Sequence, residues 1–161
     1  MGVGVSQTVP EVAYDWTYSA KGYYNDTTPI VSGDGSTVAL YSRGEKCIIV
    51  TDGKGHSLTR IPLEQKNLMA NVSAIPSLSY DGSRILTRDS HSVKCFDRAG
   101  NQLWAYERKD KIVRSGMQSW IAQLSTNGKV AIVRMFHELI WLNADDGASN
   151  ICQKCNTFDV F

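Results

Sequence analysis

Long apolar runs are absent from this sequence, and this absence excludes one class of protein. None of the apolar runs in the 161 residues approaches the roughly 20 consecutive residues that cross a bilayer as a helix. The sequence therefore predicts no membrane span. Residues 1–10 also lack the basic and apolar regions of a secretory signal peptide, so the sequence leaves the compartment undetermined.

An excess of charge of either sign is also missing. The formal net charge is +1, from 17 Lys and Arg against 16 Asp and Glu, so no global field attracts nucleic acid or a membrane surface. Helical periodicity is equally scarce. The best helical candidate, 62–70, is short and reads better as a loop, which leaves an all-β interpretation.

Cysteine is scarce, at four residues. Cys47 and Cys95 lie in apolar strand patterns and are expected to be buried. Cys152 and Cys155 form a C-x-x-C pair, the spacing of half a zinc site or of a redox pair. The three histidines lack ligand spacing, and positions 152 and 155 point to opposite faces of a strand. A structural or incidental role is favoured, and a disulfide or an intermolecular metal site stays open.

No recognisable catalytic or phosphate-binding motif occurs. The sequence has neither a nucleophile elbow nor a glycine-rich phosphate loop of standard spacing. Two turns do place a serine, a histidine and an acid together, one around His56 and the other around His91. Turns are rich in these residue types in any case. We therefore predict no catalytic residue, no resident metal and no cofactor site.

An internal repeat is the strongest feature that the sequence does contain. The pattern apolar-Ser-x-Asp/Asn-Gly, followed by an apolar run, occurs at 30–40, 78–86 and 124–132, with a spacing of 47 and then 46 residues. A second marker, a glycine turn, recurs at Gly55, Gly100 and Gly147. Two markers with one period make coincidence a poor explanation.

Each repeat predicts four strands. Asp-Gly and Asn-Gly supply the positive φ of a tight two-residue hairpin, and the flanking runs are rich in β-branched and aromatic residues. The strands are expected near 28–32, 37–43, 46–52 and 57–62, then 75–80, 84–89, 92–97 and 102–107, and finally 119–125, 130–135, 138–143 and 150–155. Four strands in about 46 residues is the content of one propeller blade.

The chain resembles the WD40-like and PQQ-like β-propeller repeat superfamily. The resemblance is carried by Ser32-Gly33-Asp34-Gly35, Ser79-Tyr80-Asp81-Gly82, the run from Cys95 to Gly100, and two similar strands, Trp16-Thr17-Tyr18 and Leu103-Trp104-Ala105-Tyr106. No Trp-Asp dipeptide occurs, so PQQ-like repeats fit better than strict WD40 repeats. The resemblance implies an all-β fold of three blades, each a four-stranded antiparallel sheet, plus one orphan strand at the N-terminus.

The expected organisation follows from this repeat. We expect a tail at 1–13, an orphan outer strand at 14–19, blades at 27–63, 74–108 and 118–155, and a tail at 156–161. The four tryptophans are expected to pack between blades rather than to form a stacking surface. They are Trp16, Trp104, Trp120 and Trp141.

The resemblance implies a function in binding more than in catalysis, since propellers host many roles. The leading hypothesis is a non-enzymatic scaffold for binding a protein partner or for self-assembly into a closed ring. Three blades are fewer than a closed propeller has, so either the chain is part of a longer protein or copies associate to close the ring. The alternatives are a portion of a PQQ-like cofactor-binding enzyme, or a sensor or surface module of a larger cell-envelope protein. A binding loop is expected between the second and third blades, at Arg108, Lys109, Lys111 and Arg114. No nucleic-acid partner is expected.

Overall fold

The described part of the chain is built from β-strands. The computed structural model describes residue 17 and residues 28–63, 75–88, 92–107, 121–135 and 138–154; for residues 135, 138 and 150–154 it describes the backbone alone. These segments contain twelve strands in three four-stranded antiparallel sheets. They contain no helix of the length and apolarity that crossing a membrane requires.

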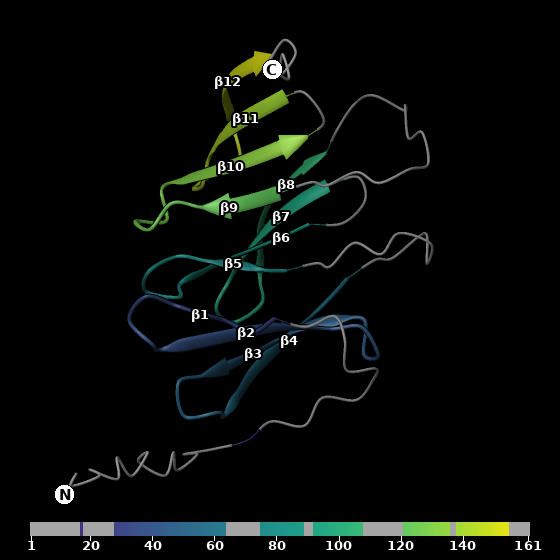
Figure 1. Cartoon of the computed structure of the whole chain (residues 1–161), viewed down its shortest axis with the longest axis vertical. Coiled ribbons are helices and arrows are strands. Elements are labelled where there is room, and N and C mark those ends of the chain that lie inside the picture. The colour runs from purple at the N-terminus through teal and green to yellow at the C-terminus, as the bar shows by residue number, and fades with distance from the viewer. Residues whose placement is uncertain are drawn as a thin grey trace, which may run out of the picture.

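The three sheets follow one another along the chain, and we call them blades 1, 2 and 3 (Figure 1). Blade 1 comprises β1 (Ile30–Val31), β2 (Thr37–Ser42), β3 (Cys47–Asp52) and β4 (Ser57–Pro62). Blade 2 comprises β5 (Ser77–Leu78), β6 (Arg84–Arg88), β7 (Ser92–Asp97) and β8 (Gln102–Glu107). Blade 3 comprises β9 (Ile121–Leu124), β10 (Val130–Met135), β11 (Glu138–Asn143) and β12 (Ser149–Lys154).

The predicted fold class is confirmed, and most strand bounds agree with the sequence prediction to within a residue or two. The first strands of blades 1 and 2 are shorter than expected. β1 starts directly after Pro29 and β5 directly after Pro76, and proline has no N–H to give to a ladder. The equivalent position in blade 3 is Ala122, which lies within β9 and pairs with Val133.

The predicted two-residue hairpins are wrong. Ser32 N donates to Thr37 O at 2.9 Å and Gly35 N donates to Ser32 O at 2.9 Å, so residues 33–36 form a four-residue loop. The same pair of bonds closes the loops at 80–83 and 126–129. The glycine of each loop has the expected positive φ, +72° at Gly35, and such loops are commonly built around a type I turn.

Each blade has two faces, and side chains alternate between them along a strand. We call the face of a blade that points toward the end of the chain the forward face, and the face that points toward the start of the chain the rear face. The rear face of blade 3 is therefore the one that packs on blade 2. One apolar core joins the forward face of blade 1 to the rear face of blade 2. It contains Ala39, Tyr41, Ile48, Val50, Ile61, Ile85 and Phe96, all buried.

A second core joins blade 2 to blade 3 in the same manner. Leu86, Val93, Cys95 and Trp104 of the forward face of blade 2 pack on Ala131, Val133, Ile140 and Leu142 of the rear face of blade 3. Cys47 and Cys95 are both buried and unbridged, as expected. Burial raises the pKa of the Cys95 thiol to about 11, so it stays protonated at neutral pH.

Candidate interaction surface

The loop between the first two strands of each blade is held by one repeated set of side-chain bonds. In blade 1, Ser32 Oγ donates to Asp34 Oδ1 at 2.7 Å and accepts from Thr37 N at 3.0 Å. The same carboxylate oxygen accepts from Ser36 N at 2.9 Å. The Ser32 and Asp34 side chains therefore accept hydrogen bonds from backbone N–H groups that the four-residue loop leaves without a partner on the neighbouring strand.

Blades 2 and 3 repeat this arrangement. Ser79 Oγ donates to Asp81 Oδ1 at 2.7 Å and accepts from Arg84 N at 3.0 Å. In blade 3, Ser125 Oγ donates to Asn127 Oδ1 at 2.8 Å, so an amide oxygen replaces the carboxylate. The Ser79 hydroxyl, helped by the Ser83 amide, lowers the pKa of Asp81 to about 2. The Ser32 hydroxyl likewise holds the pKa of Asp34 below its ordinary value.

The three loops are linked to one another across the blades. Asp34 N donates to Tyr80 O at 3.0 Å, and Tyr80 N donates to Thr126 O at 2.9 Å. The Tyr80 ring lies over Gly33, where a Cβ atom would meet its Cδ2 at 2.2 Å. Any residue with a Cβ at position 33 would therefore displace the Tyr80 ring. The loop ends form one continuous surface along the fan of blades.

Arg98 spans the boundary between blades 1 and 2 at this surface. Its Nη2 donates to Ser36 Oγ of blade 1 at 2.9 Å and also to Asp81 O, while Nε donates to Gly82 O at 3.3 Å. A shallow hollow open to solvent surrounds it, lined by Asp34, Ser36, Asp81, Ser83, Asp97, Arg98 and Ala99.

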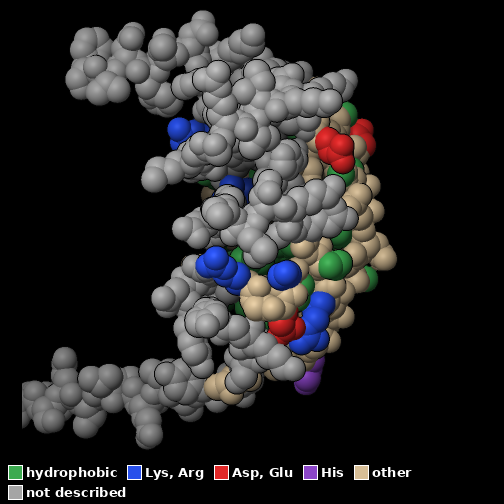
Figure 2. Space-filling model, turned by 90° about the vertical axis from the view of Figure 1, so that its right-hand side faces the viewer, with side chains coloured by type: hydrophobic (Ala, Val, Ile, Leu, Met, Phe, Trp, Pro, Cys, Tyr) green, Lys and Arg blue, Asp and Glu red, His purple; other side chains and the backbone are tan. Residues whose placement is uncertain are grey.

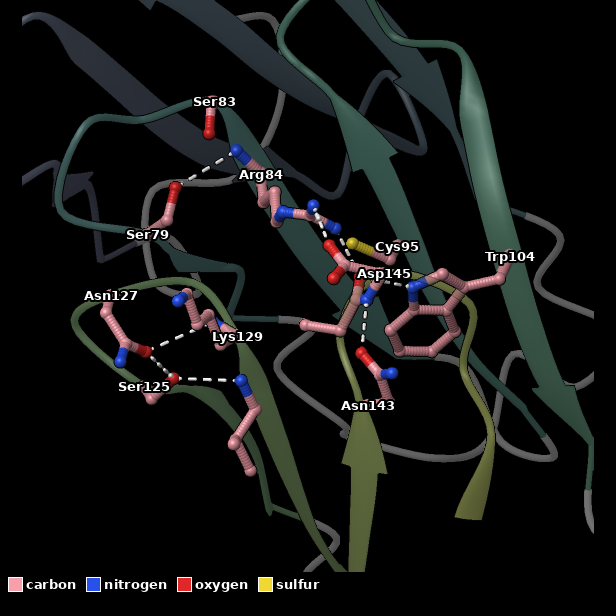
Figure 3. Close-up of polar contacts among 12 residues, drawn as sticks. Ser79, Ser83, Arg84, Cys95, Trp104, Ser125, Asn127, Lys129, Asn143 and Asp145 are labelled. Atoms are coloured by element: carbon pink, nitrogen blue, oxygen red, sulfur yellow. Dashed lines mark hydrogen bonds and ion pairs between the residues drawn. The ribbon is translucent and has the colours of Figure 1, made fainter. Parts of the chain in front are cut away.

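Arg84 and Trp104 make the corresponding link between blades 2 and 3 (Figure 3). Trp104 Nε1 donates to Ala144 O at 2.8 Å in a buried position, and Arg84 Nη1 donates to the same oxygen. Arg84 Nη2 also pairs with the Asp145 carboxylate. Three elements of two blades, β6, β8 and the β11–β12 turn, therefore meet at one carbonyl.

Sequence reasoning missed both arginines, although the repeat contained a signal for them. Arg98 stands where the other blades have Gly53 and Ala144, and Arg84 stands where they have Thr37 and Val130. A large charged residue at a position that is small or apolar in the other repeats indicates a contact made by one blade alone. Both arginines make such a contact.

Asp52 and Asp97 at this surface are engaged in building turns. His56 Nδ1 lies 2.8 Å from Asp52 Oδ2, and His56 N donates to Asp52 Oδ1 at 2.8 Å. In blade 2, Asn101 makes the same two contacts with Asp97. Since an asparagine performs the task equally well, the pair at His56 is a turn device that needs no proton-transfer chemistry.

The other predicted site residues are placed only in part. Arg108, Lys109, Lys111 and Arg114 lie outside the described residues, as do His91, Cys155, Trp16 and Trp120. Cys152 lies on β12, paired with Ile140. Among the described residues, no three His, Cys, Asp or Glu side chains gather as a metal would require. Trp104 packs between blades as expected, whereas Trp141 is half-buried.

Figure 2 shows one face of the molecule, on which the described basic and acidic side chains are interspersed. On this face, no large patch of one sign forms among the coloured residues. The mixture of signs on this face agrees with the near-zero net charge.

Comparison with known proteins establishes the fold. The chain is similar to the solved structure of the RRP9 WD40 repeats, with a TM-score of 0.60 and 14% identity over 82% of this chain and 39% of that one. It is also similar to the WD40 domain of SCAP from fission yeast, with a TM-score of 0.54 and 11% identity over 80% and 32% of the two chains. No family model and no curated protein sequence matches the chain.

Hydrazine synthase of Kuenenia stuttgartiensis is a third similar structure, with a TM-score of 0.54 and 16% identity over 84% of this chain and 39% of that one. At these identities the likeness shows the fold alone. The chain spans well under half the length of the solved chains that it matches. Its three sheets are three blades of a β-propeller, part of the ring that such domains form.

Proposed function

We propose that this array of propeller blades is a non-enzymatic scaffold that binds a protein partner or whose copies assemble into a closed ring. The observation that carries this proposal is the use of polar groups at the blade ends. Asp34, Asp81 and Asp97 accept bonds from their own loops, and Arg84 and Arg98 join neighbouring blades. Such groups stiffen a surface, and a stiff surface with variable loops suits recognition.

The similar WD40 domain structures support the same proposal at the level of the fold. The binding site that we propose is the segment from 108 to 114, which connects blades 2 and 3 and carries Arg108, Lys109, Lys111 and Arg114. Four cations against one acid, Asp110, favour a partner whose contact surface is acidic.

Alanine substitution tests the segment. Purified chain carrying alanine at Arg108, Lys109, Lys111 and Arg114 is compared with wild type in affinity capture from the source cell, followed by titration of the captured partner. The matched control replaces Lys54 and Lys129, two exposed lysines of the described loops, with alanine. We expect binding to be lost in the first variant and retained in the second, with an affinity that falls as salt rises.

Two results would contradict the proposed site. One is a partner bound equally by both variants, which moves the site away from 108–114. The other is a binding affinity that does not respond to salt, which removes the electrostatic reason for choosing this segment.

A further inference from the structure

Tyr80 is the most exposed aromatic side chain in the part of the chain that the structure describes. It is 54% exposed, whereas the other described aromatic side chains are buried or half-buried. The equivalent loop positions of blades 1 and 3 hold Gly33 and Thr126, so the ring is a feature of blade 2 alone. Blade 2 shares an apolar core with a sheet on each side. The exposure of the ring therefore does not arise from an uncovered sheet face.

The surrounding loops hold this ring in one place. Tyr80 N donates to Thr126 O at 2.9 Å, and Tyr80 O accepts from Asp34 N at 3.0 Å, so the backbone is bonded to both neighbouring blades. The ring itself lies on Gly33, where a Cβ would come within 2.2 Å of Tyr80 Cδ2. A ring that is already fixed loses little conformational entropy when a partner binds, and tyrosine suits binding surfaces for this reason.

The solvent-open hollow at the boundary between blades 1 and 2 adjoins the ring. Asp34 and Asp81, which directly follow the glycine under the ring and the tyrosine itself, both line it. Arg98 and Asp97 complete the charged part of the lining. The hollow therefore carries three carboxylates and one guanidinium, an excess of two negative charges beside an exposed aromatic ring.

The fold of the loops does not require the charge of these carboxylates. Asn127 accepts in blade 3 the bonds that Asp34 and Asp81 accept in blades 1 and 2, so an uncharged amide serves the loop equally well. The loop bonds of both aspartates end on Oδ1, so Oδ2 is the atom that a partner can contact.

The guanidinium of Arg98 does not pair off these charges either. It donates to the Ser36 hydroxyl and to the carbonyl oxygens of Asp81 and Gly82. These acceptors are neutral, so the bonds of Arg98 join blades 1 and 2 and leave the excess negative charge of the hollow in place.

We infer that the hollow beside Tyr80 is a second protein-binding surface, which receives a lysine or arginine side chain of a partner. The cation contacts the carboxylates of Asp34 and Asp81, and the methylenes of the same side chain lie on the Tyr80 ring, whose face also attracts a cation. Tyrosine is one of the residue types that most often dominate the energy of an interface.

This surface is separate from the segment at 108–114. That segment follows Glu107, at the opposite end of β8 from the turn that carries Arg98. The two surfaces suit partners of opposite charge. The inference therefore goes beyond the proposed function and does not rest on it.

Titration of the purified chain with a basic peptide tests the charged part of the hollow. The probe is hexalysine with fluorescein at its N-terminus and an amidated C-terminus, and the readout is fluorescence anisotropy. Wild type is expected to bind it with an affinity that falls as salt rises. Asp34→Asn and Asp81→Asn, which copy Asn127 of blade 3, should each weaken binding by roughly two- to fivefold. The matched control is Asp146→Asn, which removes an exposed carboxylate at the same end of blade 3 and should leave the affinity unchanged.

A second pair of variants tests the ring. Tyr80→Thr copies Thr126 of blade 3, so the loop is expected to keep its fold. It should weaken hexalysine binding by about two- to fivefold and leave the salt dependence unchanged, because it removes no charge. Tyr80→Phe keeps the aromatic face and should bind as wild type does. Circular dichroism checks that each variant is folded.

Any of three results overturns this inference. The first is a wild-type chain that does not bind hexalysine even at low salt. The second is equal weakening in Asp146→Asn and Asp81→Asn, which would show a response to total charge alone. The third is unchanged affinity in Tyr80→Thr, which removes the ring from the site. The proposed site at 108–114 is tested by capture of a different partner and stands or falls separately.

Discussion

At the scale of single residues, the blade ends show that hydrogen-bond geometry matters more than charge. Asn127 accepts the same two bonds as Asp34, from the loop serine and from a backbone N–H two residues on. Asn101 does for Asp97 what His56 does for Asp52. Because asparagine and histidine make the same contacts at equivalent positions, the contact between His56 and Asp52 is explained by the structure of the turn. It gives no support to a catalytic role for His56.

Ser79→Ala tests the loop chemistry. The change removes the donor to Asp81 and the acceptor of Arg84 N, so we expect a loss of about 1–3 kcal/mol in the free energy of unfolding at neutral pH. The measurement is urea denaturation followed by tryptophan fluorescence. Tyr80→Phe, which alters an exposed side chain of the same loop, should have little effect.

The loss in Ser79→Ala should also depend on pH. The pKa of Asp81 is depressed, so its stabilisation is complete above the ordinary value of 3.8 and fades as pH falls toward about 2. Without the Ser79 hydroxyl the depression is smaller. The difference in free energy of unfolding between wild type and Ser79→Ala should therefore narrow as pH falls from 3.8 toward about 2. A difference that stays constant would show that the Asp81 carboxylate is not the group involved.

At the scale of elements, neighbouring blades pack closely where a glycine turn of one blade contacts the outer strand of the blade before it. A Cβ at Gly100 would lie 2.7 Å from Thr59 Oγ1, and one at Gly147 would lie 2.8 Å from Trp104 Cδ2. Thr59 and Trp104 are equivalent, as partners of Val50 and Cys95. These glycines therefore serve both the turn and the boundary between sheets.

Gly147→Ala and Gly35→Ala separate these two roles. The glycines have nearly the same φ, +74° and +72°, but nothing lies within 4 Å of a Cβ at Gly35. Gly35→Ala should cost only the left-handed backbone strain, about 1–2 kcal/mol. Gly147→Ala should cost a further 1–3 kcal/mol or so from overpacking against Trp104.

Chemical denaturation of both variants measures the difference. Tryptophan fluorescence adds a readout that includes Trp104, whose indole must shift in Gly147→Ala and need not shift in Gly35→Ala. Equal losses in the two variants would show that the indole yields without cost.

At the scale of the whole molecule, the three blades differ in how completely they are covered. Blade 2 lies between two apolar cores, whereas blade 3 shares only one with its neighbours among the described residues. Because both cores include residues of blade 2, we expect its strands to be the most stable against local unfolding. Local opening takes least free energy where packing covers one face only.

Hydrogen exchange tests this gradient. Amides of β10 and β11, the middle strands of blade 3, should exchange faster than those of β6 and β7, the matched strands of blade 2. Exchange that is uniform across both pairs of strands would contradict the gradient.

Most of the fold was predictable because it is local. The period near 46, the alternation of apolar residues and the Asp-Gly or Asn-Gly markers specify the strands and their order within each blade. Loop geometry was less predictable: the Ser32 hydroxyl and Asp34 carboxylate widen the hairpin by binding backbone N–H groups, and a dipeptide rule does not capture this. The starts of β1 and β5 were misjudged because Pro29 and Pro76 were read as strand.

The sequence alone determined that the described part of this protein is a repeat of four-stranded antiparallel sheets in which Cys47 and Cys95 are buried. These properties depend on side-chain periodicity and turn chemistry, which act over a few residues. Only the tertiary structure decided which arginines join the blades, that Trp104 packs on Gly147, and which sheet face stays open. Arg84 and Asp145, or Trp104 and Ala144, are 40 to 61 residues apart, and no short-range pattern encodes such a pairing. It arises when whole blades stack, because burial of apolar surface sets their positions first and the polar bridges then form between groups that this packing has brought together.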